Sequence, residues 1–571
     1  MTFSAGLFDE LTPCYPDTEA GTGKTEYRTA GANGTYAGVN ILLDGLTPGI
    51  PVSVEVEGEN TAYKLFRMIP VPVEVNTGAK QRTEYLKNDR NENVIRRAPF
   101  FVYDALEPVY NIVMADMTTM AFSFKSIIEY CRQKRTQEWK FRITHGKESR
   151  ELTFYVDQYP YTVKKAGKDT HKFVTWFSLD EIAQCHHVQK WSPEFEAILE
   201  RYLRAAAFAR QNMMAISPAD CFDVCEDGVK LNEAHFSMLI RTAQKAGMYY
   251  FEGGALTCRE SNFCDDDAFY QSLDHEHIQN SDEVAEQFKR KAFDDFDNGV
   301  HALDCLTHKR ADSAEGRAVI ASMAGQLYAA IQKYGLTERW MQSALDEPND
   351  ALCSVYREIT SIIRREMPGV PILEPVLPTE KLEGALDIWC PSIDVYENNR
   401  AFFDAQAEKG DRLFVYTCLT PGGNYLNRLL DLERLRIVYF GWAPAKYPNL
   451  EGYLHWGANQ YMGMDPYKRT CYTFSEQALE FHPKRAMFLP GGDTCMLYPG
   501  YREALISVRS EAHRIGFEDL CMLEALKEKA PEAAEKIVEK VFRGYCDFEK
   551  SVERYREARR ELLEAVTEEA G

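Results

Sequence analysis

Residues Trp340–Asp350 read WMQSALDEPND. A mostly apolar run ends in two adjacent carboxylates, Asp346 and Glu347, and Pro348 follows them. Proline is well tolerated in the first turn of a helix, so the pattern predicts a strand, a carboxylate pair and a helix. Paired carboxylates at the end of a strand suit acid/base chemistry on a glycosidic bond. On these residues alone, a cap on the following helix is the more common role for either carboxylate.

The same alternation of strand and helix continues on both sides of this stretch, from Ser192 to about residue 500. Seven short apolar runs have the length and bounding residues of strands: Asn212–Ile216, Met248–Phe251, Arg339–Leu345, Pro371–Pro375, Leu386–Cys390, Leu413–Tyr416 and Gly452–Trp456. Helical periodicity predicts helices between them, among others at Glu233–Ala246, Glu315–Tyr334, Ala351–Glu366 and Asn424–Val438. Repeated units of this kind predict a (β/α)8 barrel, with the missing third strand between Phe251 and Arg339. An open doubly wound sheet is the alternative, but no G-x-G-x-x-G motif supports it.

The flanking regions have different patterns. Between residues 26 and 180, short runs such as Tyr36–Leu43 and Leu152–Val156 alternate with period two, which is typical of an antiparallel β-sandwich. After Gly500, the segments Arg502–Leu526 and Ala530–Val566 have charged faces and apolar stripes without a strand signal. The sequence therefore predicts a sandwich over residues 1–190, a catalytic barrel over 191–500 and a helical region over 501–571.

Composition narrows the function classes. The chain has 571 residues and a formal net charge of −21, which argues against a nucleic-acid partner because such binding depends on Lys and Arg. No apolar stretch reaches the roughly 20 residues that cross a bilayer, and the N-terminus does not resemble a signal peptide. Fifteen scattered cysteines fit reduced thiols. We expect a cytoplasmic protein without membrane partners, whose oligomeric state stays open.

No motif predicts a metal or a cofactor. Gly21–Thr25 (GTGKT) lacks the first glycine and the preceding strand of a P-loop, so a flexible turn is the simpler interpretation. Asp274–His277 (DHEH) does not have the four-residue histidine spacing of a zinc protease. The cysteines form no paired CxxC framework. We therefore expect neither a cofactor nor a metal ion.

Carboxylates and aromatic residues gather at or near the ends of the predicted strands. They are Glu252 at the second strand, Asp346 and Glu347 at the fourth, Trp389 at the sixth, Tyr416 at the seventh and Trp456 at the eighth, with Arg210 and Asn212 at the start of the first. Barrel enzymes build their sites at the carboxyl ends of the strands. Aromatic faces pack on sugar rings while polar groups bind the hydroxyls. This set favours a catalytic role for Asp346 and Glu347 over a helix cap.

A series of motifs in consistent order resembles glycoside hydrolase family 123, whose relatives were grouped as domain-of-unknown-function family 4091. The motifs are FVTWFSL at Phe173–Leu179, the KWSPEFEAILERYLRAAAFARQN helix that follows, SALDEP, DIWCP, GYLHWGANQY at Gly452–Tyr461, PGGDTCMLYPG at Pro490–Gly500 and ISVRSEAHRIGFEDL at Ile506–Leu520. The resemblance implies a sandwich, a barrel and a C-terminal region.

The resemblance also implies a retaining β-N-acetylgalactosaminidase-type activity that works by substrate assistance. On this chain, Asp346 would orient the 2-acetamido group and Glu347 would protonate the leaving oxygen. Trp389, Tyr416, Trp456 and Asn459 would be sugar contacts. The chain departs from the family where Ala458 and Gln460, rather than aromatic residues, flank Asn459.

Two alternatives remain open beside an exo-acting retaining glycosidase for a 2-acetamido sugar. In the first, the sugar lacks the acetamido group and another carboxylate, with Glu252 the first candidate, acts as the nucleophile. In the second, the chain is a carbohydrate-binding protein without catalytic activity.

Overall fold

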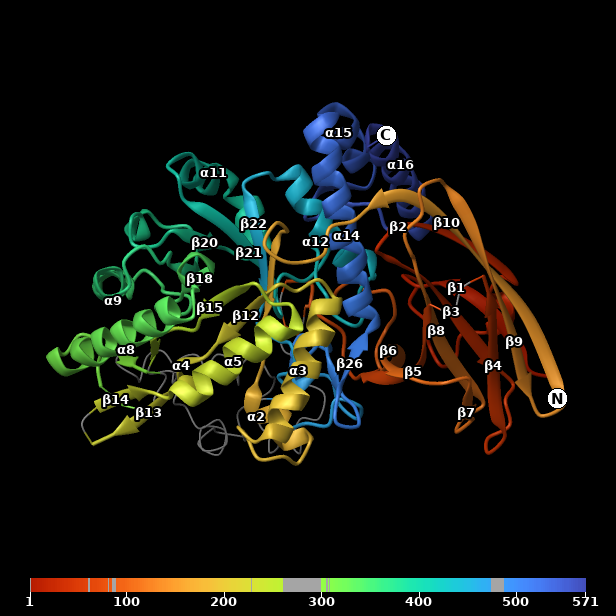
Figure 1. Ribbon diagram of the computed structural model, residues 1–571, viewed down its shortest axis with the longest axis horizontal. Helices are drawn as coiled ribbons and strands as arrows, with labels where there is room; N and C mark the ends of the chain where they lie inside the picture. The colour runs from red at the N-terminus through yellow and green to blue at the C-terminus, as the bar shows by residue number, and fades with distance from the viewer. Residues whose placement is uncertain are drawn as a thin grey trace.

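The computed structural model describes residues 2–59, 62–80, 82–84, 89–226, 228–259, 299–303, 307, 309–473 and 487–570. Asp274–His277 lies outside these residues. The chain forms a β-sandwich, a β/α barrel and a group of C-terminal helices (Figure 1). In Figure 1 the sandwich lies to the right of the barrel, and the last helices lie above the junction of the two.

Two twisted sheets form the N-terminal sandwich. The first has the strand order β1-β3-β8-β5-β6-β26-β25 and the second β2-β10-β9-β4-β7. Inward-facing aromatic and branched side chains such as Phe124, Trp139 and Phe154 fill the space between the sheets. The strands are β1 Ser4–Asp9, β2 Glu26–Asn33, β3 Tyr36–Asp44, β4 Pro51–Gly58, β5 Tyr63–Val73, β6 Phe100–Pro108, β7 Ile112–Met114, β8 Thr119–Ile127, β9 Arg135–His145 and β10 Glu148–Thr162.

The structure corrects two details of the predicted sandwich. β2 pairs with β10 in parallel, whereas the other strand pairs of both sheets are antiparallel. β25 (Tyr498–Pro499) and β26 (Ala504–Ser507), which follow the barrel in the chain, join the first sheet beside β6. The prediction of a purely helical chain after Gly500 is therefore wrong at β26 and at a short hairpin over residues 542–548, because such short strands carry too little periodicity to be seen in the sequence.

Eight parallel strands form the central barrel. Their order is β18-β15-β12-β11-β22-β21-β20-β19, and a parallel bridge between Gln342 and Ile372 joins the two ends of this sheet. The Gln342 amide donates to the Pro371 carbonyl at 2.9 Å across this junction. The strands are β11 Lys172–Thr175, β12 Met213–Ile216, β15 Tyr250–Gly253, β18 Trp340–Gln342, β19 Leu373–Pro375, β20 Ile388–Cys390, β21 Arg412–Tyr416 and β22 Leu450–His455.

The eighth strand lies elsewhere than predicted. β11, at Lys172–Thr175, pairs with both β12 and β22, so it is the first strand of the barrel. The prediction of a missing third strand between Phe251 and Arg339 is wrong, and Glu252 lies on the third strand rather than the second. β11 lies on the N-terminal side of residue 190, where the sandwich was expected to end.

Helices and short hairpins connect the barrel strands. Ser192 caps α3 by accepting a hydrogen bond from the Phe195 amide, and Pro193 opens that helix, as the sequence predicts. The prediction of a helix at Asn424–Val438 is wrong, because α12 begins only at Leu435. The helices are α2 Leu179–Cys185, α3 Pro193–Phe208, α4 Pro218–Cys221, α5 Glu233–Ala246, α8 Ala314–Lys333, α9 Cys353–Glu366, α10 Ile393–Asn398, α11 Arg400–Glu408 and α12 Leu435–Lys446. The hairpins are β13 Phe222–Cys225 with β14 Gly228–Leu231, β16 Thr257–Arg259 with β17 Val300–Ala302, and β23 Tyr472–Thr473 with β24 Met487–Leu489.

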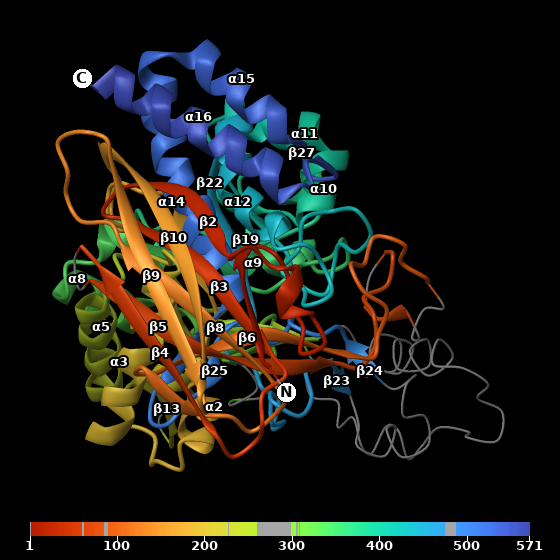
Figure 2. The ribbon, with the colours of Figure 1, turned by 90° about the vertical axis from the view of Figure 1, so that its right-hand side faces the viewer.

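The first C-terminal helix packs between the barrel and the sandwich, and the other two lie above the junction of these domains (Figure 2). They are α14 Val508–Lys529, α15 Pro531–Val541 and α16 Val552–Ala570, with a small hairpin of β27 Phe542–Gly544 and β28 Asp547–Phe548. α12 and α14 cross at Gly441 and Gly516, where a Cβ on Gly516 would lie 2.1 Å from the Val438 carbonyl oxygen. Only glycine permits this approach of two helix backbones.

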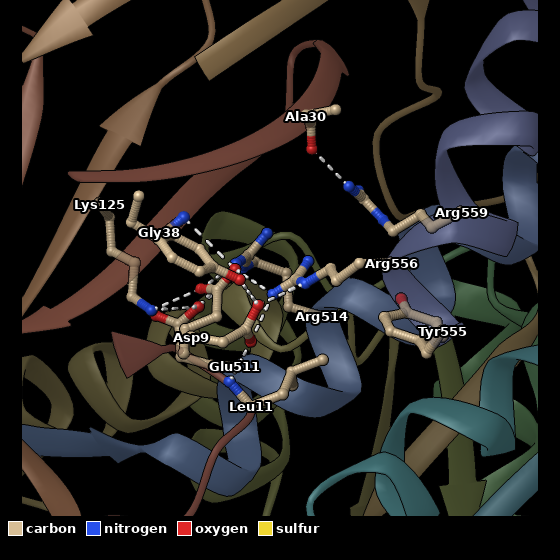
Figure 3. A network of polar contacts seen from close by, with 12 residues as sticks. Asp9, Leu11, Ala30, Gly38, Lys125, Glu511, Arg514, Tyr555, Arg556 and Arg559 are labelled. Atoms are coloured by element: carbon tan, nitrogen blue, oxygen red, sulfur yellow. Dashed lines mark hydrogen bonds and ion pairs between the residues drawn. The ribbon is translucent and has the colours of Figure 1, made fainter. Parts of the chain in front are cut away.

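A buried network of ion pairs joins these helices to the sandwich (Figure 3). Glu10, at the end of β1, binds Lys125 of β8 at 2.7 Å and Arg556 of α16 at 3.2 Å. Arg556 also binds Asp9 at 2.8 Å. Arg514 of α14 binds Glu511 at 2.7 Å in the same network. Each of these buried charges has a partner of opposite sign, as buried ions require. The network links the first strand of the chain to its last helix.

Among the residues that the structure describes, no helix is long and apolar enough to span a membrane.

Candidate active site

The interior face of the barrel determines which side chains reach the site. Successive residues of a strand point to opposite faces. Val174, Phe414 and Leu454 point into the barrel core, so the residues two positions later, Trp176, Tyr416 and Trp456, face the same interior at the carboxyl ends of β11, β21 and β22. By the same alternation, Glu252 follows Tyr250 on β15.

The carboxylate pair lies in the segment between β18 and α9. α9 begins at Cys353, and its N-cap position is Leu352, whose side chain makes no capping hydrogen bond. The helix predicted at Ala351–Glu366 therefore starts two residues later than expected, and Pro348 lies before it rather than in its first turn. Neither Asp346 nor Glu347 caps α9, which removes the simplest structural explanation for the pair. Glu347 has a left-handed backbone with φ of 46°, an uncommon conformation for a residue with a side chain.

A pocket of about 320 Å³ opens at the carboxyl ends of the first strands. This volume is at the small end of the range for ligand pockets, about 300–1,000 Å³. Its lining includes Trp176, Glu252, Arg259, Asp346 and Gln460. Both an aromatic face and several hydrogen-bonding groups are thus available to a small polar ligand.

The surrounding protein raises the pKa of two carboxyls that line this pocket, those of Asp346 and Glu252. Desolvation, aided by the adjacent charge of Glu347 and opposed by Arg259, raises the pKa of Asp346 to about 7. Solvent reaches Asp346 through the pocket, while the surrounding protein atoms desolvate its carboxyl. Desolvation also raises the pKa of Glu252 to about 8, against a hydrogen bond of 2.9 Å from the Trp176 indole. Near neutral pH, Glu252 is therefore mostly protonated and Asp346 is close to half-titration.

A third carboxyl, that of Glu374 on β19, holds the backbone before the pair. Its Oε1 accepts a hydrogen bond from the Ser343 hydroxyl at 2.6 Å, and its Oε2 accepts the backbone N–H groups of Ala344 at 2.8 Å and Leu345 at 3.1 Å. The Tyr356 hydroxyl of α9 donates to the same Oε2 at 3.3 Å. Glu374 is fully buried.

Two of the aromatic residues that the sequence predicted reach carboxylates at the barrel mouth. The Tyr416 hydroxyl donates to Oε1 of Glu347 at 2.6 Å. Burial and the Glu347 charge raise the pKa of Tyr416 well above its ordinary value, so this hydroxyl remains a donor. The Trp456 indole donates to Oδ1 of Asp493 at 3.1 Å, and burial raises the pKa of Asp493 to about 7.

Four other residues that the sequence predicted as substrate contacts form hydrogen bonds with other parts of the protein. Arg210 donates to the Lys164 carbonyl at 2.7 Å, and the Asn212 amide binds the backbone of Phe173 and Gly167, both at the amino-terminal end of the barrel. Trp389 is fully buried on the outer face of β20, where its indole donates to Asp411 and its ring packs against α11. The Asn459 amide uses both of its ends on the Ser178 backbone. The alternation of β20 explains the correction for Trp389, and the strand start at Met213 explains those for Arg210 and Asn212, because each places the side chain away from the pocket.

The described residues contain no group of three or more His, Cys, Asp or Glu side chains arranged to hold a metal ion.

Comparison with known proteins gives the family. The family model of the glycoside hydrolase 123 catalytic domain matches residues 176–526, more than half of the chain. The chain belongs to glycoside hydrolase family 123. It is therefore a glycoside hydrolase, and its substrate is a glycoside or an oligosaccharide. No curated protein matches it.

A solved structure with a TM-score of 0.69 shares the fold of this family 123 enzyme. A family 123 glycoside hydrolase from Clostridium perfringens, studied for glycolipid glycan hydrolysis, superposes with a TM-score of 0.69 at 12% identity, covering 99% of this chain and 98% of that one. A β-glucuronidase from Parabacteroides merdae reaches a TM-score of 0.30 at 10% identity, covering 85% of this chain and 50% of that one. A family 5 mannosidase from Rhizomucor miehei reaches 0.33 at 11% identity, covering 64% and 95%.

Sequence reasoning missed two residues that line the pocket, Trp176 and Arg259, and one that holds the backbone beside it, Glu374. Trp176 was accessible to it, because Phe173–Trp176 has the alternation of a short strand that ends in an aromatic residue. Arg259 and Glu374 had no signal of their own, since only the folded chain brings them to the carboxylate pair.

Proposed function

We propose that this family 123 enzyme is a retaining exo-glycosidase that removes a terminal 2-acetamido sugar by substrate-assisted catalysis. By the resemblance to the family, the sugar is of the N-acetylgalactosamine type. One observation carries the proposal: Asp346 lines a small pocket, while the next residue, Glu347, is held beside that pocket by Tyr416. One carboxyl thus meets the sugar ring and the other the bond to be broken.

The reaction assigns a separate task to each carboxyl. The Asp346 carboxylate accepts a hydrogen bond from the N–H of the acetamido group. This bond orients the acetamido carbonyl oxygen toward the anomeric carbon. That oxygen forms a bond to the anomeric carbon as the glycosidic bond breaks, and Glu347 gives its proton to the leaving oxygen. Glu347 then takes a proton from water, whose oxygen attacks the anomeric carbon and opens the cyclic intermediate. Two displacements at one carbon retain its configuration.

The raised pKa of Asp346 is compatible with this division. The surrounding protein and the charge of Glu347 raise the pKa of Asp346 to about 7. An acetamido N–H that approaches Asp346 stabilises the ionised form of this carboxyl, which is the form that the proposed orienting role needs.

The state of Glu252 argues against the alternative of a covalent enzyme intermediate. A nucleophilic carboxylate must be ionised. The pKa of Glu252 is raised to about 8, so its neutral carboxyl suits a hydrogen bond to a sugar hydroxyl better than attack on carbon. The Trp176 indole fixes its orientation.

A panel of aryl glycosides tests the proposal. We expect hydrolysis of aryl N-acetylgalactosaminide or N-acetylglucosaminide, and no comparable rate on the galactoside or glucoside. Glu347→Gln should abolish cleavage of substrates with poor leaving groups but act less on activated aryl glycosides, because these need little protonation. Equal rates with and without the acetamido group, or an unchanged Glu347→Gln variant, would refute the assignment. Binding without turnover across the panel would favour a carbohydrate-binding protein.

A further inference from the structure

Hydrogen bonds from neighbouring residues hold the backbone that leads to the carboxylate pair. The Ser343 amide donates to the Gly253 carbonyl at 2.8 Å, and Gln342 donates from its side chain to the Ser343 carbonyl at 2.8 Å. The Thr257 hydroxyl donates to the Ala344 carbonyl at 2.7 Å. The N–H groups of Ala344 and Leu345 are left for the Glu374 carboxyl, which accepts both. Glu374 thus completes the set of bonds that fix this segment.

We propose that Glu374 is a positioning residue of the active site, whose carboxyl fixes the Ser343–Leu345 backbone and thereby aims Asp346 and Glu347 at the substrate. This inference rests on the assignment of Asp346 and Glu347 as the catalytic pair. Glu374 does not itself line the pocket, although Ser343 and Leu345, which it binds, do. It acts through the two residues that follow the segment it binds.

The position of Glu374 in the barrel explains why it suits this task. β19 lies beside β18 at the junction that closes the barrel, so a side chain on the outer face of β19 reaches the end of β18. Its fourth donor, Tyr356, comes from α9, the helix that follows the pair. One carboxyl therefore ties together the strand before the pair, the helix after it and the neighbouring strand.

The protonation of Glu374 is linked to the catalytic charge. Burial raises the pKa of Glu374 to about 8 against hydrogen bonds from Ser343, Ala344 and Leu345, and the charge of Asp346 raises it further. A neutral Glu374 can donate from Oε1 to the Ser343 hydroxyl while Oε2 still accepts the two backbone N–H groups. A glutamine can reproduce this arrangement, because its amide nitrogen donates and its oxygen accepts.

Three substitutions separate the length of the side chain from its charge. Glu374→Gln keeps the length of the side chain and is uncharged like the protonated carboxyl, so we expect kcat within about fivefold of the wild type. Glu374→Asp keeps the acid but shortens the side chain by one methylene, and Glu374→Ala removes all four bonds. In both we expect kcat to fall roughly 100-fold, the effect of a misplacement of about 1 Å, with KM changed much less. The loss should be larger for poor leaving groups, since Glu347 no longer meets the glycosidic oxygen.

Asp387→Asn is the matched control for stability. Asp387 also holds a backbone N–H of the β19 segment, that of Ile372 at 2.7 Å, but it does so at the amino-terminal end of the barrel. We expect this variant to lower the melting temperature without changing the leaving-group dependence. A merely structural Glu374 would behave in the same way.

The rates on aryl glycosides that the wild type cleaves, together with a crystal structure of Glu374→Asp, decide the question. Wild-type kcat in the folded Asp variant, or a loss in the Gln variant as large as in the Asp variant, would overturn the proposal. If Glu374→Ala does not melt cooperatively, the Gln and Asp variants still discriminate. The crystal structure needs no substrate: residues 343–347 unmoved in the Asp variant would overturn the inference. An inactive wild type would instead count against the proposed function.

Discussion

The Tyr416 hydroxyl lies 2.6 Å from Oε1 of Glu347 and donates a hydrogen bond to it. Tyr416 ends β21, and Glu347 lies in the segment after β18, a strand that is not a neighbour of β21 in the barrel. This contact fixes the orientation of the Glu347 carboxyl, while the Asp346 carboxyl lines the pocket.

Tyr416→Phe should lower kcat on substrates with poor leaving groups by roughly 10- to 100-fold. A hydrogen bond to a charged group contributes about 1.5–3 kcal/mol, and each 1.4 kcal/mol is about tenfold in rate. Steady-state kinetics on a series of aryl glycosides measures the effect. Tyr250→Phe is the control, because Tyr250 lies at the start of β15, at the opposite end of the barrel from the pair, and donates to the Lys168 carbonyl. Equal kinetics in both variants would show that Tyr416 does not orient the acid.

Glu252→Gln should retain at least about a tenth of the wild-type kcat, because the amide resembles the neutral carboxyl that burial favours. Complete loss of activity would support Glu252 as a nucleophile. A trapped covalent sugar on Glu252 would establish the same alternative directly.

The same variant should change how stability depends on pH. The pKa of Glu252 is raised from 4.5 to about 8 in the folded chain. Between these values the folded state keeps a proton that the unfolded state has released, so Glu252 makes the free energy of unfolding fall as pH rises. Glu252→Gln has no such proton, and its stability relative to the wild type should increase from pH 5 to pH 8. Urea unfolding across this range measures the difference, and parallel pH dependences would contradict the raised pKa.

Glu10→Gln should destabilise the fold by about 3–5 kcal/mol, the typical cost of removing one partner from a buried ion pair. Although burial opposes its ionisation, Lys125, Arg556 and Arg514 hold the pKa of Glu10 below its usual range. Its contribution is therefore present above about pH 4.5 and is lost as pH falls below that value.

Urea unfolding of Glu10→Gln at pH 7 and pH 4 tests both parts of this prediction. The gap to the wild type should be wide at pH 7 and narrower at the lower pH. Glu138→Gln is a matched surface control, since Glu138 pairs with Lys140 on an exposed strand face, and it should change stability by less than about 0.5 kcal/mol. A Glu10 effect as small as that of Glu138 would mean that the network does not stabilise the fold.

Local sequence patterns predicted most strands and several helices of the barrel. They could not predict how the barrel closes or which side chains hold the carboxylate pair in place. Glu233–Ala246 was predicted with the bounds that α5 has, because Asn232 caps it and Gly247 ends it. β11 was missed because four residues between a sandwich and a long helix carry little periodicity. Asp346 and Glu347 were visible as a pair at a strand end, but Glu374 becomes meaningful only when β19 closes the barrel beside β18. The buried network around Glu10 joins residues about 500 positions apart, which no local pattern reveals.

The proposed reaction depends most on the acetamido group acting as the nucleophile. The most direct measurement compares kcat for an aryl 2-acetamido glycoside with kcat for the same glycoside carrying a 2-trifluoroacetamido group. Fluorine withdraws electrons from the carbonyl oxygen, so substrate assistance predicts a fall of at least about 100-fold at a similar KM. An unchanged kcat would contradict substrate assistance and would move the search for the nucleophile to the carboxylates of the protein.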